Sequence, residues 1–368
     1  MALIVQKYGG TSVADPDRIK SVADHVAYTK KHGNDVIVVV SAMGKTTDNL
    51  LSLAHQVSDT HPGREMDMLL TTGERISMAL VSMALAGLGI EAVSFTGSQV
   101  GIITDTVHTK AKILDIKGDR VREALAAGKV VVVAGFQGVS TDDEITTLGR
   151  GGSDTTAVAI AAALGADVCE IYTDVTGIFS ADPRIAPQAR KLARLQFEEM
   201  LEMAGVGSKV LALRSVEFAR NHNVPIHVRS SFTWEHGTWV SDEKSQGENS
   251  MEEPIISGVV HDASESKVTV VGVPDRPGIS AALFEGLANA NVNVDMIVQN
   301  TSKDGLTDIS FTMPKADMKV AEDIVSRVAK EIGANGVTHD AEIAKVSLVG
   351  AGMKTSPGVA AKMFRVLA

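Results

Sequence analysis

The run KYGGTS, residues 7–12, carries residue types that suit phosphate binding and lies directly after the first apolar segment of the chain. Adjacent glycines let the backbone approach a ligand closely and turn its N–H groups toward an anion. Lys7 adds a point charge, and the two hydroxyl residues add donors. A tight turn with a surface lysine would have the same residues. The run therefore predicts a phosphate-binding turn, with the plain turn as the alternative.

A second glycine-rich run, GRGGSDTT at residues 149–156, leads directly into an alanine-rich segment. Ser153 or Asp154 can cap the expected helix, whose free N–H groups would face the glycine turn. Arg150 has the planar fork that holds a carboxylate through two hydrogen bonds. This run predicts an anion-binding helix start, although plain N-capping also explains Asp154.

A third run, YTDVTGIFSADPR at residues 172–184, follows a further apolar segment. Its carboxylates, Asp174 and Asp182, could hold a metal ion or a ribose, and Arg184 could reach a phosphate. Asx and proline turns explain the two aspartates almost as well. Glu74 stands at an expected helix start, where a carboxylate is favourable even without a function.

Other familiar nucleotide motifs are incomplete in this sequence. The run GKT at residues 44–46 resembles the end of a Walker A loop, but Val39 stands where its first glycine belongs. Asp154 likewise stands where a dinucleotide fingerprint has its last glycine. Five histidines show no ligand spacing, and no metal-ligand set is predicted: His25, His32, His55, His222 and His227.

The elements that must position these runs alternate up to about Ser231. Strands are predicted over Leu3–Gln6, Val36–Ser41, Ala92–Thr96, Val130–Ala134, Val168–Thr173 and Ile226–Arg229. Helices are predicted over Asp17–Lys31, Arg75–Leu88, Thr155–Leu164 and Phe197–Met203. This order indicates an α/β fold with a mainly parallel sheet covered on both faces. In such sheets ligands bind outside the carboxyl ends of the strands.

Composition narrows the class of protein. The 368 residues are 44% hydrophobic and 22% charged, as in a globular chain of two or three domains, and only 4% aromatic, so small and branched aliphatic residues must fill the core. A net charge of −10 without a Lys/Arg-rich run disfavours a nucleic-acid surface. No apolar run of 18 residues and no signal peptide is expected, and Cys169 is expected to be a buried, inert thiol, which together predict a cytoplasmic protein without a membrane partner.

The last third of the chain contains a repeat. A polar stretch, Val240–Pro254, predicts a linker. Beyond it, Lys267–Gly278 (KVTVVGVPDRPG) matches Lys345–Gly358 (KVSLVGAGMKTSPG), and a helix start follows each copy. The first copy continues through apolar runs at Val292–Val298 and Thr307–Met313 into a helix near residues 316–333. This β-α-β-β-α order is typical of a small ferredoxin-like module.

Six runs in this order resemble the aspartokinase branch of the amino-acid kinase family: KYGGTS, VVSAMG, TTGERIS, FTGSQVG, TLGRGGSDTTA and YTDVTGIFSADPR. The resemblance covers essentially the whole chain, and the repeats resemble ACT regulatory modules. It implies an αβα sandwich followed by ferredoxin-like ACT modules. It also implies transfer of the γ-phosphoryl group of ATP, with Mg²⁺, to the β-carboxylate of L-aspartate, at the start of lysine, threonine, methionine and diaminopimelate synthesis.

By this resemblance the runs divide into three groups of roles. Lys7, Asp154 and Arg150 would be catalytic, with Asp154 orienting groups around the phosphoryl group or Mg²⁺. The nucleotide would be bound by Lys7, Gly9, Gly10, Thr11, Ser12, Thr173, Asp174, Phe179, Ser180, Asp182, Pro183, Arg184 and Lys209. Aspartate would be bound by Ser41, Glu74, Arg150, Gly151, Gly152 and Ser153.

The first ACT copy has a strand-to-helix turn whose helix start could bind an amino-acid carboxylate. A merely structural turn is the alternative. By resemblance the effector, threonine and/or lysine, would contact Asp275, Arg276, Gly278, Ile279, Ser280, Ala281, Asn293, Asp295, Gln299 and Asn300. Homo- or hetero-oligomers through the ACT modules are expected.

The predicted domains are a kinase domain (1–240), a linker (241–254), a first ACT module (265–340) and the start of a second (341–368), to which a strand at 255–260 could belong. Since only ten residues follow Gly358, we expect a chain that stops within the second module, with impaired feedback control. Two alternatives stay open. Glutamate 5-kinase, acetylglutamate kinase or uridylate kinase would share the fold, and an amino-acid-sensing protein would bind without turnover.

Overall fold

The computed structural model describes residues 1–242, 256–290, 292–301, 305–350 and 356–368. They form two compact units, one of Met1–Gly258 with Val349–Ala368 and one of Val259–Leu348. Most of the predicted linker, residues 243–254, lies outside the described residues.

The first unit is built on a sheet of eight strands in the order β10-β12-β11-β9-β1-β2-β6-β3. The bounds are β10 (Arg194–Leu195), β12 (Thr238–Val240), β11 (Ile226–Ser230), β9 (Val168–Thr173), β1 (Leu3–Tyr8), β2 (Asp35–Val40), β6 (Val130–Ala134) and β3 (Ala92–Phe95). The strands from β11 to β3 are parallel, and β12 runs antiparallel to β11. The predicted mainly parallel sheet is confirmed.

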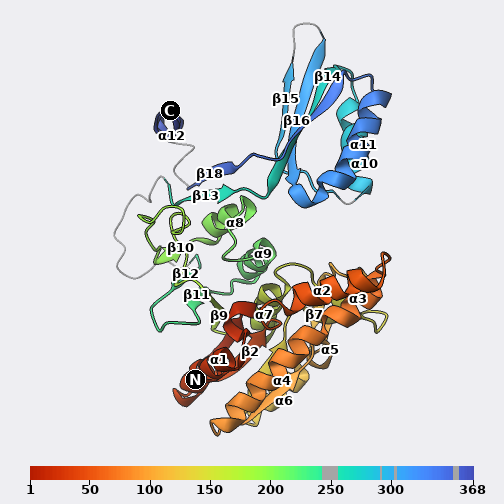
Figure 1. Cartoon of the computed structure of the whole chain (residues 1–368). Coiled ribbons are helices and arrows are strands. Elements are labelled where there is room, and N and C mark those ends of the chain that lie inside the picture. The colour runs from red at the N-terminus through yellow and green to blue at the C-terminus, as the bar shows by residue number, and fades with distance from the viewer. Residues whose placement is uncertain (243–255, 291, 302–304, 351–355) are drawn as a thin grey trace. The chain divides into compact units, whose positions relative to one another are not determined.

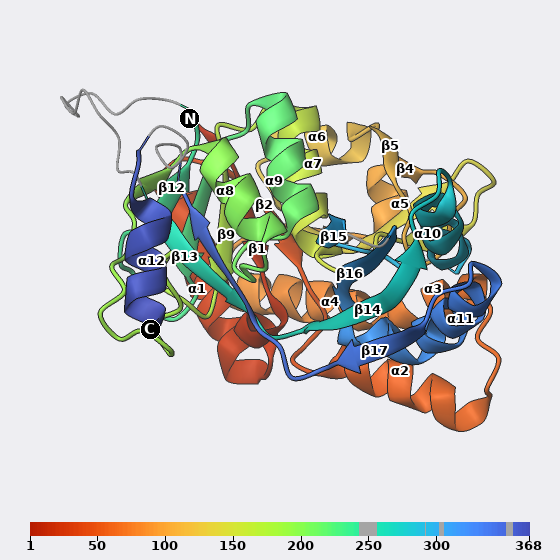
Figure 2. The ribbon, with the colours of Figure 1, turned by 90° about the horizontal axis from the view of Figure 1, so that it is seen from above.

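Helices cover both faces of this sheet. The bounds are α1 (Pro16–Lys31), α4 (Thr72–Gly87), α5 (Gly97–Val100), α6 (Asp119–Ala126), α7 (Gly152–Leu164), α8 (Phe197–Gly205) and α9 (Leu213–His222). α1 and α4 pack on one face, while α7 packs on β1, β2 and β9 with α9 and α8 beyond it (Figure 1; Figure 2). Since both faces are covered, β2 and β6 are nearly continuous runs of valine.

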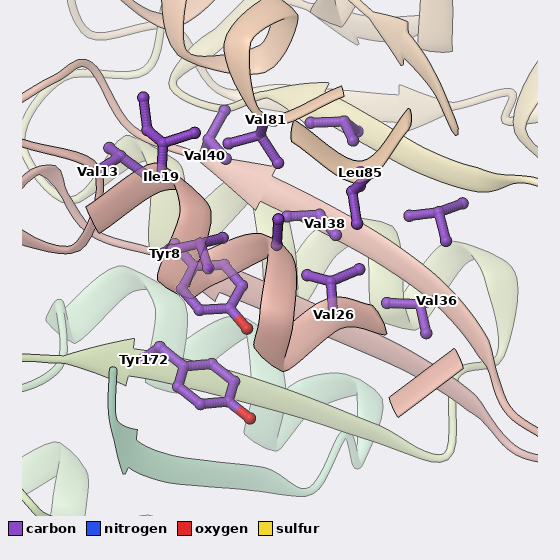
Figure 3. Close-up of a cluster of buried hydrophobic side chains, with 14 residues drawn as sticks. Tyr8, Val13, Ile19, Val26, Val36, Val38, Val40, Val81, Leu85 and Tyr172 are labelled. Carbon is purple, nitrogen blue, oxygen red and sulfur yellow. The ribbon is translucent and has the colours of Figure 1, made fainter. Parts of the chain in front are cut away.

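Figure 3 shows the core between the sheet and the helices α1 and α4. Alternate residues of β2, Val36, Val38 and Val40, face this core. The rings of Tyr8 and Tyr172 stack there with centroids 4.6 Å apart. This face therefore joins the ends of β1 and β9, where two of the predicted ligand-binding runs begin.

One helical stretch among the described residues, Gly63–Gly87, is long and apolar enough to cross a membrane by length and composition alone. The expectation of no such run was therefore too strict. The stretch joins α3 (Gly63–Leu70) to α4, in which Val81 and Leu85 are fully buried against the sheet core. One side of α4 thus faces the core, while Ile76 and Met83 on the same helix are exposed. Before it lies α2 (Thr46–Val57).

A second sheet in the first unit, in the order β5-β4-β7-β8, was not predicted. Its bounds are β4 (Ile102–Thr104), β5 (Ile113–Ile116), β7 (Gln137–Ser140) and β8 (Ile145–Thr147). These strands are three or four residues long, which is too short for an alternating pattern to stand out in the sequence. β8 leads into the run that precedes α7.

The second unit contains a four-stranded antiparallel sheet in the order β15-β16-β14-β17, with two helices on one face (Figure 1). Its bounds are β14 (Glu265–Pro274), α10 (Ile279–Asn289), β15 (Ile297–Thr301), β16 (Leu306–Pro314), η2 (Lys315–Asp317), α11 (Met318–Glu331) and β17 (Gly336–Asp340). The predicted β-α-β-β-α order is confirmed, and β17 completes it. β15 begins at Ile297, later than the predicted Val292.

The strands β13 (Gly258–Asp262) and β18 (Lys345–Val349) form a two-stranded sheet, and α12 (Val359–Leu367) follows. The chain enters and leaves the second unit at these strands. Within the first unit the N–H of Ser257 donates to the carbonyl of Val349 over 2.8 Å, and the hydroxyl of Ser257 bonds Glu199 of α8. Both connections between the units are thus held side by side.

Candidate active site

Lys7 and Asp154 form an ion pair just beneath the first glycine turn. Lys7 Nζ lies 2.6 Å from Asp154 Oδ1, and each side chain is 12% exposed. Lys7 comes from β1, and Asp154 comes from the first turn of α7. A Cβ on Gly9 would lie 3.4 Å from the same ammonium nitrogen. A largely buried ammonium group therefore lies directly beside the glycine turn, where it is placed to attract an anion.

The glycine turn is pressed against the loop that follows β2. The N–H of Gly44 donates to the carbonyl of Gly10, and a Cβ on Gly10 would come within 3.0 Å of the carbonyl oxygen of Ala42. Ser41 is tied to the same place, because its N–H donates to Tyr8. A larger residue at position 10 would push the two loops apart, which gives this glycine a packing reason as well as a possible ligand-binding one.

The start of α7 needs small residues for the same reason. Gly151 precedes the helix with φ +70°, and a Cβ there would lie 2.3 Å from Ala212. A Cβ on Gly135, which follows β6, would lie 2.8 Å from the hydroxyl of Ser153. Arg150 is exposed beside this turn. The first turn of α7 thus lies at the carboxyl ends of β2 and β6.

Glu74 reaches this edge from the first turn of α4. One oxygen accepts a hydrogen bond from the N–H of Ala42 over 3.2 Å, and the other is buried without a partner. Burial raises the pKa of Glu74 to about 7, although two backbone N–H groups oppose the shift. A buried carboxylate without a cation is the kind of group that a ligand ammonium can complete.

Asp67 was not predicted as a site residue, yet its hydrogen bonds fix the segment that leads to Arg150. It is fully buried on α3 and accepts hydrogen bonds from the hydroxyl of Thr147 (2.6 Å), from Thr109 N (3.1 Å) and from His108 Nδ1 (2.7 Å). Thr147 ends β8 and stands three residues before Arg150. A lone aspartate between methionines in the sequence gave no signal of this role.

The third run continues beyond the end of β9, and four of its polar side chains are paired within the run. The hydroxyl of Thr173 donates to Asp174 over 3.0 Å. Arg184 forks onto Asp182 through Nε (3.0 Å) and Nη2 (2.8 Å). The remaining predicted nucleotide residues are placed as follows: Phe179 pairs with Lys191, Ser180 bonds Arg190, Pro183 is half-buried, and Lys209 is exposed between α8 and α9.

Ser12 differs from its neighbours in the first run. Thr11 is exposed, but Ser12 is buried, and its hydroxyl donates to the hydroxyl of Ser231 over 2.8 Å. Its N–H donates to the carbonyl of Gly9 over 2.9 Å. Both of its donors are therefore occupied inside the protein, and its hydroxyl does not face the predicted phosphate site.

Beneath the site lies a polar network on the α1 face. Glu170 accepts hydrogen bonds from Gln6 (2.8 Å), Arg229 (3.0 Å) and Tyr172 (3.1 Å). Burial opposes its ionisation, but His227, Arg229 and Gln6 together lower the pKa of Glu170 to about 2. Cys169 is buried, which raises the pKa of its thiol, as expected of an inert residue.

The predicted effector residues fall at two ends of the second unit. The turn after β14 holds Asp275 to Ala281, and β15, parallel to β14, brings Gln299 and Asn300 to the same end, with β16 between. Asn293 and Asp295 lie at the other end, where Asp295 pairs with Lys345. The five residue-to-residue steps along β16 from Thr307 to Thr312 span about 17 Å, so one module does not bring all of the predicted effector residues together.

The described residues contain no group of three or more His, Cys, Asp or Glu side chains placed to hold a metal ion. Asp154 is the buried carboxylate beside Lys7. Mg²⁺ in phosphoryl-transfer sites commonly takes one or two carboxylates and completes its shell with substrate phosphates and water. The donor set therefore fits an ion bound through a nucleotide.

Comparison with known families and proteins agrees with this arrangement. The amino acid kinase family model matches residues 2–230, and ACT domain models match residues 267–333 and 346–368. The aspartokinase of Mycolicibacterium smegmatis is 60% identical over all of this chain and 88% of its own length. That of Corynebacterium glutamicum is 56% identical over all of this chain and 87% of its own length.

Solved structures show the same likeness. Escherichia coli aspartokinase III in complex with aspartate and ADP is 26% identical with a TM-score of 0.81, over 99% of this chain and 91% of that one. The aspartate kinase of Synechocystis is 47% identical with a TM-score of 0.60, and this chain spans 63% of its length. With a family model over most of the chain and close relatives over all of it, the chain belongs to the aspartokinases, the ACT-bearing branch of the amino-acid kinase family.

Proposed function

We propose that the protein transfers the γ-phosphoryl group of ATP to the β-carboxylate of L-aspartate, giving 4-phospho-L-aspartate and ADP. The observation that carries this proposal is the buried Lys7–Asp154 pair beneath the glycine turn. The solved E. coli relative binds aspartate and ADP together, which supports both substrates. An amino-acid sensor without turnover would have no need of a buried lysine under a phosphate turn.

The reaction asks for positioning and charge neutralisation rather than a base. A side-chain carboxyl with a reference pKa of about 3.9 is already ionised at neutral pH. One of its oxygens attacks the γ-phosphorus, the new O–P bond forms, and the bond to the β,γ-bridging oxygen breaks so that ADP leaves. Lys7 would offset the charge that develops on the phosphoryl oxygens.

The residues that would bind aspartate are assigned by matching their charges to the charged groups of the substrate. The unpartnered oxygen of Glu74 would accept from the ammonium group of aspartate. The exposed Arg150 would hold a carboxylate of aspartate through its fork, and Ser41 with Gly151–Ser153 would line the same pocket. Asp154 would hold Mg²⁺, which neutralises charge on the phosphates when bound.

The nucleotide side combines the glycine turn with the end of β9. Gly9, Gly10 and Thr11 would contact the phosphates through backbone N–H groups and one hydroxyl. The run from Thr173 to Arg184 and Lys209 would bind the remainder of the nucleotide. Because Arg184 and Asp182 pair with each other here, nucleotide binding would have to open that exposed pair.

The second unit would carry the feedback control. The E. coli relative has a structure in complex with lysine and aspartate, which supports an amino-acid effector. We propose that threonine and/or lysine is sensed at the end of the module where Asp275–Ala281 and Gln299–Asn300 lie, in an oligomer joined through ACT modules. The proposal includes both homo- and hetero-oligomers.

The proposed domains are those expected from the sequence: a kinase domain over 1–240, a linker over 241–254, a first ACT module over 265–340 and the start of a second over 341–368. The end of β12 at Val240 and the span from β14 to β17 support these limits. We also propose that the enzyme acts in the cytoplasm, which its buried, unpaired Cys169 suits.

Trapping the acyl phosphate tests the proposal directly. Purified protein, L-aspartate and MgATP in the presence of hydroxylamine should give aspartate hydroxamate. Lys7→Ala should lower kcat by about 100-fold or more while changing the KM for aspartate little, since it removes an electrostatic stabiliser of the transition state. Arg150→Ala should chiefly raise the KM for aspartate. Absence of hydroxamate at saturating substrates would refute the proposed activity.

A further inference from the structure

Ser231 follows β11 and lies outside all of the predicted ligand-binding runs. It is 3% exposed and lies beyond the last residue of a parallel strand, at the same edge as the turn after β1. Its N–H donates to the carbonyl of Thr173 over 2.9 Å, which continues the pairing of β11 with β9 by one residue. The backbone of Ser231 is therefore fixed on the strand that carries the proposed nucleotide run.

The side chain of Ser231 links the end of β9 to the turn after β1. Its hydroxyl accepts a hydrogen bond from Ser12 over 2.8 Å and donates to the carbonyl of Thr173 over 3.3 Å. One donor and one acceptor are thus used, and the chain of contacts runs from the turn after β1 to the end of β9. Ser12 in turn closes the glycine turn through its bond to Gly9.

We infer that Ser231 is a positioning residue that sets the glycine turn relative to the nucleotide run at Thr173. The inference rests on the proposed nucleotide site and deepens it. No ligand need touch Ser231, because both ends of its bridge belong to segments that would contact the nucleotide.

The physical effect follows from burial. Ser12 is 1% exposed, so loss of the Ser231 hydroxyl leaves the Ser12 hydroxyl without water or a protein partner. An unsatisfied buried hydroxyl is unfavourable, and the turn can avoid this cost only by moving away from its present position. A turn that moves binds phosphates less well, whereas the aspartate side, built from α4 and α7, keeps its contacts.

The test compares Ser231→Ala with Ser231→Thr, which keeps a hydroxyl, and with Ser230→Ala as a matched control. Ser230 is equally buried on the same strand end, but its hydroxyl accepts only from Phe232 N in its own loop. Ser231→Ala should weaken binding of MgADP, measured by calorimetry, and raise the KM for ATP, each by about 10-fold. The KM for aspartate should stay within about twofold. Ser231→Thr and Ser230→Ala should resemble the parent.

A double-mutant cycle adds a readout that general destabilisation would not give. Ser12→Ala with Ser231→Ala removes both ends of the bond, so the ADP affinity of the double variant should fall by less than the product of the two single effects. Independent effects, an equal rise in both KM values, or an unchanged ADP affinity would each overturn the inference. Calorimetry with ADP needs no turnover, so a failure of the proposed reaction would be seen separately, in the hydroxamate assay of the parent protein.

Discussion

Two regions of the first unit, which contains the kinase domain, each bury a glutamate. Burying a carboxylate charge is unfavourable, and the surroundings of the two residues compensate for it to opposite degrees. Glu74 is 3% exposed at the substrate edge, and Glu170 is 7% exposed inside the sheet. Glu170 is surrounded by Gln6, Tyr172 and Arg229, whereas Glu74 has backbone N–H groups on one side and an unpartnered oxygen on the other. The two carboxylates are thus similarly buried, but their hydrogen-bonding and charged neighbours are very different.

The pKa values follow this difference. Burial raises the pKa of Glu74 to about 7, and nothing cationic offsets it. Burial also opposes the charge of Glu170, yet His227 and Arg229 lower its pKa to about 2. The charge of Glu170 is therefore compensated by groups of the protein, whereas that of Glu74 can be compensated only by a cationic ligand. A substrate ammonium would do for Glu74 what Arg229 does for Glu170.

The largest effect should come from removing the satisfied carboxylate. Glu170→Ala leaves the half-buried Arg229 without its counter-charge, and breaking a buried ionic pair in this way costs about 3–5 kcal/mol. Urea unfolding followed by circular dichroism should show this loss in the free energy of unfolding. Glu74→Gln is the matched control and should lose no stability. A Glu74→Gln variant destabilised as much as Glu170→Ala would abolish the contrast.

The stability of the two regions should respond to pH with opposite signs. Glu74 titrates at about 7 in the folded protein and at about 4.5 unfolded, so stability falls as pH rises from 4.5 through 7. Glu170 titrates at about 2 folded and 4.5 unfolded, so stability is lost as pH falls below 4.5. At 1.36 kcal/mol per unit, each effect amounts to about 3 kcal/mol in all.

The measurement is the free energy of unfolding of the parent minus that of Glu74→Gln or Glu170→Gln, taken from pH 3.5 to 8. The first difference should decrease as pH rises toward neutrality, and the second should decrease as pH falls. Differences that do not vary with pH would show that neither carboxylate has a shifted pKa.

For catalysis we expect the reverse order of effects: substitution of Glu74 should matter more than substitution of Glu170. Glu74→Gln removes the counter-charge proposed for the aspartate ammonium, and a hydrogen bond to a charged group contributes about 1.5–3 kcal/mol. The kcat/KM for aspartate should therefore drop by about 10- to 100-fold, with little change in the KM for ATP. In the parent, kcat/KM for aspartate should fall below pH about 7 as Glu74 becomes protonated. A Glu74→Gln enzyme that retained this pH dependence would rule out the assignment.

The smallest effect tests the geometry of the satisfied region alone. Arg229 Nη1 donates both to Glu170 and to the hydroxyl of Tyr172, over 3.0 and 3.3 Å. Arg229→Lys keeps the charge but not the planar fork, so about 1 kcal/mol of unfolding free energy should be lost. Aspartate kinetics should not change, since the network does not face the substrate. A change in the aspartate KM larger than the change in stability would contradict this separation.

The sequence was most informative where elements are long and regular. β6 and β9 fall where apolar runs predicted them, and the runs at the ends of β1 and β9 meet because parallel strands share a carboxyl edge. The short strands of the second sheet left no periodic signal. Ser231 and Asp67 were missed because their roles depend on partners more than 40 residues away along the chain, Ser12 and His108 among them. Only the end position of Ser231 on a parallel strand could have pointed to it.

The close pairing of Ser257 with Val349 gives the molecule a modular character. Both crossings into Val259–Leu348 leave the kinase unit from adjacent backbone positions, 2.8 Å apart from nitrogen to oxygen. The intervening segment is thus an insertion at a single point, and joining Ser257 to Val349 by a short glycine turn would remove it while keeping residues 349–368, which lie within the stretch matched by the second ACT model, attached to the kinase domain. The same point offers a place to exchange one sensing module for another while the catalytic chain keeps its own connectivity.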